Sequence, residues 1–193
     1  MPHRRFAPLL ALVLGLLLPV VASAGPADSF VKDQQTELMG LLKKGKGCDK
    51  ATPVLDRVLD YDALAHGSLA DDWGNHSEAE LQEFQRLLTG LVRKAYCKNI
   101  SDIAGYDVGV DGEEKIDDGV LVKTVATSRS NRHEEPVHID YLLHEVDGKW
   151  RAFDVVTESS SMVNNYRHQF RRVIKKDGFQ KLLEKMAKKL RSG

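Results

Sequence analysis

The chain has 193 residues, which suits one domain or at most two. Its 28 basic and 28 acidic residues balance, and this balance argues against a protein that binds nucleic acid over its whole surface. The two cysteines do not form a C-x-x-C motif, so a thiol–disulfide oxidoreductase is poorly supported.

The N-terminus has the pattern of a secretory signal peptide. Arg4 and Arg5 precede an uncharged run over 6–22, and an Ala-Ser-Ala sequence ends at Ala24. A membrane anchor is the alternative, but the run of about 17 residues is short for a span and two prolines interrupt it. We therefore expect a signal peptide over 1–24, cleavage after Ala24 and a single domain over 25–193.

Cys48 and Cys97 are the next feature along the chain. An even number of cysteines in an exported protein favours a disulfide, with two free thiols as the alternative. The bond would close a loop of about 50 residues, which is worth roughly 4 kcal/mol if the effect is entropic.

The first half of the chain has helical periodicity. Apolar residues between Phe30 and Leu42 recur at helical spacing, and Thr52-Pro53 resembles an N-cap followed by proline at the first helical position. The sequence 77–80, SEAE, is a capping box, and the wide apolar stripe behind it extends to Tyr96. Three helices are therefore predicted before the middle of the chain.

The middle, from Tyr106 to Val156, alternates with a period of two and is predicted to be an antiparallel meander of about four strands. Asp111-Gly112 is expected to make one turn, and Asp147-Gly148 a tight hairpin. One strand places an apolar face on one side, formed by Val137, Ile139, Tyr141 and Leu143.

The end of the chain returns to helical periodicity. We expect Ser159 to Ser161 to begin one helix, and Asp177 with Gln180 to cap the last one. The order of helices, meander and helices predicts an α+β fold, in which the sheet packs against N- and C-terminal helices. Ten Lys and Arg residues against two acids lie from Arg167 to the end, which makes this part strongly basic.

No catalytic set stands out. The serines at 159–161 lack a surrounding G-x-S-x-G, and no H-E-x-x-H motif, cysteine–histidine cluster or glycine-rich phosphate loop occurs. His138, Asp140 and His144 share one strand and allow a metal site, but a solvated strand face is the favoured interpretation. We predict no metal, no cofactor and no enzymatic activity.

A cone-shaped α+β enzyme similar to ketosteroid isomerase is one alternative. Such an enzyme needs an acid or a base that points into the cone, and the predicted apolar strand face contains none. An envelope adaptor that binds only protein, with a filled core, is the other alternative.

The C-terminal motif resembles that of the MlaC-like, toluene-tolerance family of periplasmic lipid-binding proteins. The matching residues are Asp154-Val155, Ser161, Val163, Asn165-Tyr166-Arg167, Gln169-Phe170, Ile174, Gly178 and Leu182-Leu183. With the order of the preceding helices and strands, the resemblance extends over about 28–190.

The resemblance implies a soluble phospholipid carrier in the periplasm, with no stable membrane anchor and no nucleic-acid partner. Its partners would be an inner-membrane lipid ABC transporter complex and an outer-membrane lipoprotein complex, and the bound phospholipid would be cargo rather than a cofactor. A hopanoid is the alternative lipid. Moving one CH₂ group out of water is worth about 0.8 kcal/mol, so keeping two acyl chains of roughly 16 carbons out of water is worth on the order of 25 kcal/mol. An apolar cavity provides such an environment.

The same resemblance, placed on the predicted apolar faces, suggests a set of cavity residues. These are Leu88, Leu91, Val122, Ile139, Tyr141, Phe153, Val155, Val163, Tyr166 and Phe170. Arg167 is the candidate for the rim or the head group, with a structural hydrogen bond or ion pair as the alternative. The basic C-terminal helices could steer the carrier to an acidic partner or an anionic lipid, and a solvated helix face explains them equally well.

Overall fold

The structure is a computed structural model that describes residues 25–45 and 47–192. The predicted signal peptide lies outside the described residues. Within the described part, none of the helices combines the length and the apolar character that crossing a bilayer requires.

A five-stranded antiparallel sheet forms the centre of the fold. Its strands follow one another in chain order, so the sheet is a simple meander. The bounds are β1 Tyr106–Ile116, β2 Gly119–Ser128, β3 Val137–Val146, β4 Lys149–Thr157 and the two-residue β5 Ser160–Ser161. The predicted α+β class and meander are confirmed.

The turns agree with the sequence prediction in one place and differ in another. Asp147 and Gly148 connect β3 to β4 with φ of 50° and 71°, the left-handed values that a tight hairpin needs. Asp111 and Gly112 were predicted to turn, but they lie inside β1, where the pairing with β2 shifts by one residue after Val110. Gly112 has φ of 131°, so the glycine accommodates a bulge and the strand continues.

Four α-helices and one short 3-10 helix precede the strands in the chain. They are α1 Pro26–Lys43, α2 Cys48–Val58, α3 Tyr61–Leu69, the 3-10 helix η1 Ala70–Asn75, and α4 Glu78–Ile103. The predicted capping box of α4 is confirmed: Ser77 Oγ accepts from the Glu80 backbone N–H, and the Glu80 carboxylate accepts from the Ser77 N–H at 3.0 Å. The prediction that Thr52-Pro53 begins a helix is wrong, because α2 already begins at Cys48 and Thr52 Oγ1 donates back to the Cys48 carbonyl at 2.9 Å.

Two helices follow the sheet, α5 Met162–Asp177 and α6 Phe179–Arg191. Ser161 caps α5, as the serine run predicts, and its hydroxyl accepts from the Asn164 N–H at 3.0 Å. The expected cap of α6 by Asp177 and Gln180 is wrong. Asp177 is instead the last residue of α5, and Gly178, with φ of 86°, joins the two helices without a side-chain cap.

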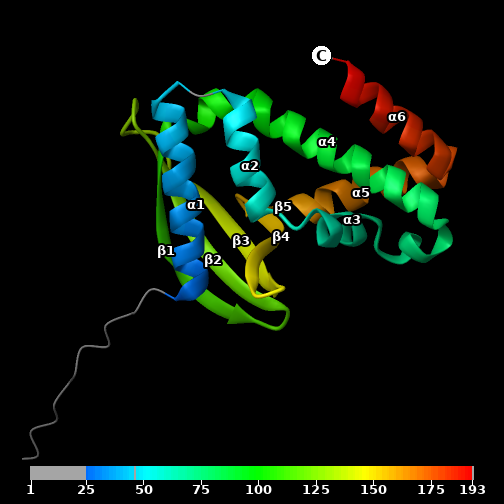
Figure 1. Ribbon diagram of the computed structural model, residues 1–193, viewed down its shortest axis with the longest axis horizontal. Coiled ribbons are helices and arrows are strands. Elements are labelled where there is room, and N and C mark those ends of the chain that lie inside the picture. The colour runs from blue at the N-terminus through cyan, green and yellow to red at the C-terminus, as the bar shows by residue number, and fades with distance from the viewer. Residues whose placement is uncertain (1–24, 46, 193) are drawn as a thin grey trace, which may run out of the picture.

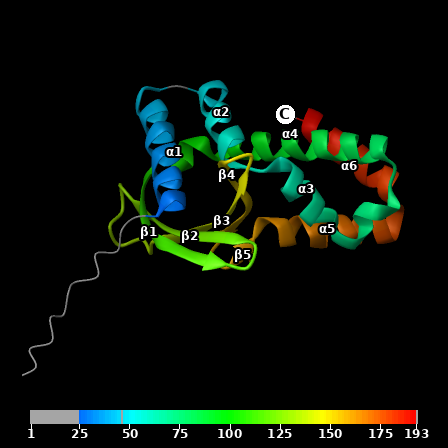
Figure 2. The ribbon, with the colours of Figure 1, turned by 60° about the horizontal axis from the view of Figure 1, so that its bottom comes forward.

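The helices gather on one face of the sheet and extend beyond it. Figures 1 and 2 show α1 and α2 side by side over the sheet, while α4 runs from the sheet to the far end of the molecule and lies against α6. Buried apolar side chains of α3, α4, α5 and α6 fill that far end, including Leu64, Phe84, Leu87, Phe170 and Leu182. The well-packed core thus lies among α3, α4, α5 and α6. At the other end of the molecule, α1 and α2 cover the sheet.

Candidate functional site

An apolar cavity of about 400 Å³ lies between α1, α2, α4, the start of α5 and the covered face of the sheet. Tyr141 of β3 and Val155 and Thr157 of β4 reach it, because Tyr141 pairs with Val155 and paired residues lie on the same face. The lining consists of Val31, Gln34, Gln35, Leu38, Val54, Leu55, Val58, Leu59, Val92, Ala95, Tyr96, Asn99, Ile103, Tyr141, Val155, Thr157, Met162 and Tyr166.

The lining residues carry no formal charge at neutral pH. Burial raises the pKa of the Tyr96, Tyr141 and Tyr166 hydroxyls above the ordinary value of 10, and the neighbouring Tyr141 adds to the shift at Tyr96. All three phenols are therefore neutral and can only donate or accept a hydrogen bond. The lining offers shelter and a few polar atoms, but neither a base nor an activated nucleophile.

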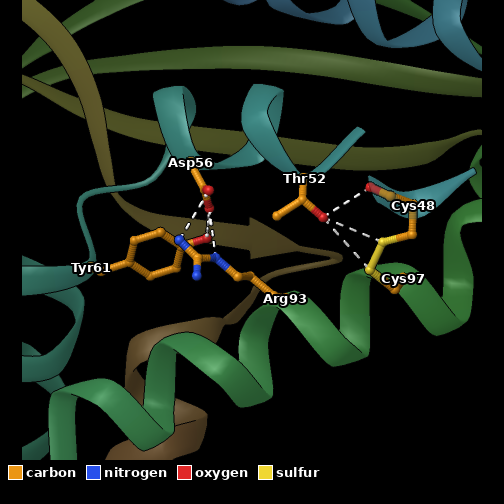
Figure 3. Close-up of a disulfide and its surroundings, with 6 residues drawn as sticks. All are labelled: Cys48, Thr52, Asp56, Tyr61, Arg93 and Cys97. Carbon is orange, nitrogen blue, oxygen red and sulfur yellow. Dashed lines mark hydrogen bonds and ion pairs between the residues drawn. A yellow bond between two sulfur atoms is a disulfide. The ribbon is translucent and has the colours of Figure 1, made fainter. Parts of the chain in front are cut away.

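A disulfide between Cys48 and Cys97 fixes one wall of this cavity. It is the pair that the sequence favours, and it joins the first residue of α2 to α4, with the two Cα atoms 5.3 Å apart. Figure 3 shows the bond beside Thr52, on the side of α2 that faces α4. The α2 wall cannot separate from α4 at this end while the bond is intact.

An ion pair supports the other end of the same wall (Figure 3). Arg93 of α4 donates two hydrogen bonds to the Asp56 carboxylate, at 2.8 and 3.0 Å, and Tyr61 donates a third to Asp56 at 2.9 Å. The guanidinium also lies over the Tyr61 ring, 5.5 Å from its centre. Burial and the Asp56 acceptor raise the pKa of Tyr61, so its hydroxyl remains a donor.

The segment from α2 to α3 is attached to the sheet by polar contacts. Arg151 of β4 donates to the Asp56 carbonyl at 2.6 Å, near the end of α2. Asp60 caps α3 and its carboxylate also lies 2.7 Å from His144 Nε2 of β3. His144, one of the histidines considered as a metal ligand, therefore has a structural partner.

Metal binding has no further support in the described part of the chain. Within residues 25–45 and 47–192, no group of three His, Cys, Asp or Glu side chains is arranged to hold an ion.

The structure places the suggested cavity residues at several locations. Tyr141, Val155 and Tyr166 line the apolar cavity. Leu91 and Phe170 line a neighbouring groove between α4, α5 and α6, to which Tyr166 also belongs.

The remaining suggested residues lie away from the cavity lining. Leu88 and Val122 are fully buried in the core, and Ile139 is half-buried on the covered face of the sheet, beside Thr124. Phe153 and Val163 border a separate, more polar hollow at the junction of α3, α5 and the sheet.

Arg167 also lies at that polar hollow. Its Nε donates to the Gly67 carbonyl of α3 at 2.9 Å, which agrees with the structural alternative for this residue. A β-carbon at Gly67 would lie 3.0 Å from Val163 Cγ1, so α3 and α5 approach closely here. Arg167 thus holds α5 against α3 and is not part of the apolar lining.

Sequence reasoning missed the contribution of the first two helices. Val31 and Leu38 of α1 form the roof of the cavity, and Val54, Leu55 and Val58 of α2 form one of its walls. Their helical spacing was visible, but the spacing does not reveal whether a stripe meets a filled core or an empty space.

The comparisons with known proteins agree on one family. The family described as MlaC protein matches residues 31–188. The chain is 24% identical over 180 residues to the toluene tolerance protein Ttg2D of Pseudomonas putida, a match that covers 88% of this chain and 82% of that protein.

A solved structure gives the same fold. The phospholipid-binding protein from Ralstonia solanacearum, determined in complex with a phospholipid, superposes with a TM-score of 0.73 at 18% identity, over 86% of this chain and 97% of the other. Because the family match extends over most of the chain, the protein belongs to the MlaC family.

Proposed function

We propose that the protein is a periplasmic carrier that holds the acyl chains of a phospholipid in its apolar cavity. The observation that carries the proposal is a cavity of about 400 Å³ whose lining has no charged residue, in a chain of the MlaC family. The structurally similar Ralstonia solanacearum protein was solved with a phospholipid bound, which supports the choice of lipid.

The cavity also weighs against the two alternatives. A ketosteroid-isomerase-like enzyme needs an ionisable acid or base in the cone, and the cavity offers only phenols whose pKa burial has raised. A protein-only adaptor would have no reason to retain an unfilled apolar space, because closing such a space stabilises a fold.

Loading should widen the cavity. Its volume is near the lower end of the roughly 300–1,000 Å³ that small-ligand sites occupy, and a lipid with two acyl chains is larger than such ligands. The disulfide and the Asp56–Arg93 pair hold α2 to α4. We therefore expect α1, of which only Ala27, Asp28 and Val31 are buried, to move when lipid enters.

The cellular role is part of the same proposal. The carrier would be exported with cleavage after Ala24 and would exchange phospholipid between an inner-membrane ABC transporter complex and an outer-membrane lipoprotein complex, which maintains the asymmetry of the outer membrane. Cross-linking in cells, with a photoreactive residue on an exposed face, would test these partners.

The first experiment is to purify the mature protein from a bacterial periplasm, extract it with organic solvent and identify bound lipids by mass spectrometry. Near-stoichiometric phospholipid is the expected result, and N-terminal sequencing of the same sample would test cleavage after Ala24. A hopanoid would change the cargo but keep the carrier. A protein that purifies without lipid and takes none from phospholipid vesicles would overturn the proposal in favour of the adaptor.

A further inference from the structure

A second groove, of about 580 Å³, adjoins the cavity at the C-terminal end of the molecule. It lies between α4, α5 and α6, and its floor is apolar. The floor residues are Leu91, Phe170, Val173, Leu182 and Met186.

The groove and the cavity share Ala95, Asn99 and Tyr166. Tyr166 stands at their border, with its ring stacked on that of Phe170 at 5.4 Å between centres. Ala95 is exposed although it lies within α4, because it faces this hollow region and has only a methyl group. The two spaces therefore meet along Ala95, Asn99 and Tyr166, and an elongated ligand can occupy both.

The chemistry of the groove differs from that of the cavity. Four lysines border it, Lys94, Lys98, Lys185 and Lys189, and none of its lining residues is acidic. Lys94 Nζ is engaged by the end of α6, where it donates to the Lys189 and Leu190 carbonyls at 2.8 and 3.1 Å. Lys185 pairs with Asp177 at 2.5 Å.

Lys98 and Lys189 differ from Lys94 and Lys185 in the contacts of their ammonium groups. Among the residues that the structure describes, neither ammonium group takes part in a hydrogen bond or an ion pair, and both side chains are exposed. They lie on opposite walls of the groove, on α4 and α6, above an apolar floor. This arrangement complements a molecule with an apolar part and an anionic part.

We infer that the groove holds the anionic head group of the bound phospholipid, with its phosphate between Lys98 and Lys189, while the acyl chains extend past Tyr166 into the cavity. This inference rests on the proposed lipid-carrier function. It predicts that the carrier prefers lipids with a net negative charge, because their head groups gain from both lysines and lack an ammonium group of their own.

The test uses the full chain, produced in a bacterial periplasm and stripped of lipid, and vesicles of equal parts phosphatidylglycerol and phosphatidylethanolamine. Mass spectrometry gives the total bound lipid and the ratio of the two head groups. The variant Lys98→Ala/Lys189→Ala removes the two lysines of the groove. Lys176→Ala/Lys188→Ala is the matched control, since it removes the same charge from exposed positions of α5 and α6 outside the groove.

We expect the wild type to enrich phosphatidylglycerol, and the groove variant to lose that enrichment by about fivefold for each lysine, with total lipid retained. The control should keep the wild-type ratio, and Lys98→Arg/Lys189→Arg should restore most of it. An unchanged ratio in the groove variant would overturn the inference, and so would an equal loss in the control, which would indicate diffuse attraction by the basic helices. A wild type that binds neither lipid would instead overturn the proposed function itself.

Discussion

The cavity and the groove are neighbours with opposite chemistry, and α4 forms a wall of both. Val92 and Tyr96 of this helix line the cavity, whereas Leu91, Lys94 and Lys98 line the groove. Because successive helical residues point about 100° apart, a change of one position is enough to move from one space to the other. One helix thus separates a surface suited to acyl chains from a surface suited to an anion.

The two regions are also held together differently. The α2 wall of the cavity is tied to α4 by a disulfide and by the Asp56–Arg93 pair. The α6 wall of the groove rests on apolar packing and on Lys94, which donates to its last carbonyls. Changes at the cavity wall should therefore affect stability, whereas changes at the groove should affect which lipid is bound.

The largest expected effect comes from blocking the space that the two regions share. In Ala95→Trp the indole would fill the junction beside Tyr166, so we expect bound lipid to fall at least tenfold while the circular dichroism spectrum is kept. Ala79→Trp, at an exposed position in the first turn of the same helix, is the control and should bind lipid as the wild type does. Normal lipid content in Ala95→Trp would mean that the ligand does not pass this junction.

The next largest effect is expected from removing the disulfide that joins the α2 wall of the cavity to α4. The disulfide closes a loop with a sequence separation of 49 residues, and Cys48→Ser/Cys97→Ser should lower the free energy of unfolding by about 4 kcal/mol, measured with urea. The head-group ratio of any lipid that remains bound should not change, since neither cysteine lines the groove. A loss below about 1 kcal/mol would show that packing alone holds α2 in place.

Much of the scaffold around the two regions follows from local sequence signals. The capping box of α4, the Asp147-Gly148 hairpin and the serine cap of α5 are predictable because each depends on residues close together in the chain. The pairing of Cys48 with Cys97 could be expected because only two cysteines are present.

The wrong predictions arise where the same short sequence is compatible with two different local structures. An Asp-Gly pair suits a turn, but at Gly112 the same conformational freedom serves a bulge inside a long strand. Thr-Pro suits a helix start, but at Pro53 the helix has already begun five residues earlier. Neither signal contains information about the neighbouring strand or helix, which decides the outcome.

The cavity itself is the least predictable part. Val122 and Tyr141 are paired residues of adjacent strands on the same face, yet Val122 is fully buried in the core whereas Tyr141 lines the cavity. The difference depends on which helix covers each strand, and this is a property of the tertiary packing. An alternating pattern identifies the covered face but not the position of a void under it.

A smaller effect tests the ion pair at the other end of the α2 wall. Arg93→Met keeps most of the side-chain volume but removes both hydrogen bonds to Asp56, and we expect a loss of about 1–2 kcal/mol in the free energy of unfolding. This expected loss in the free energy of unfolding is smaller than for a buried ion pair, because the Arg93 and Asp56 side chains are 43% and 32% exposed.

The control for Arg93 lies on the same helix. Arg86 makes a similar two-bond contact with Glu83, but both side chains are more exposed, at 62% and 42%. Arg86→Met should cause no measurable change. Equal losses in the two variants would mean that Arg93 acts through α4 itself and not by holding α2.

The smallest expected effect concerns Asp28, at the base of α1, where we expect the cavity roof to move. Burial and the nearby Glu113 carboxylate raise the pKa of Asp28 above 3.8, and the Gly25 N–H opposes this shift in part. Between the unfolded and the folded pKa the native state binds the proton more tightly, so this residue lowers stability as the pH rises through that window. Asp28→Asn removes the buried charge. The variant should therefore gain stability relative to the wild type at pH 7, and gain less at pH 3.5. Melting temperatures at both pH values would measure this.

The control is Asp33→Asn, which removes one charge from an exposed position of the same helix and should show a smaller difference between the two pH values. If Asp28→Asn instead lost stability at pH 7, the charged form of Asp28 would be holding α1 to the sheet, and the roof would be anchored as firmly as the α2 wall.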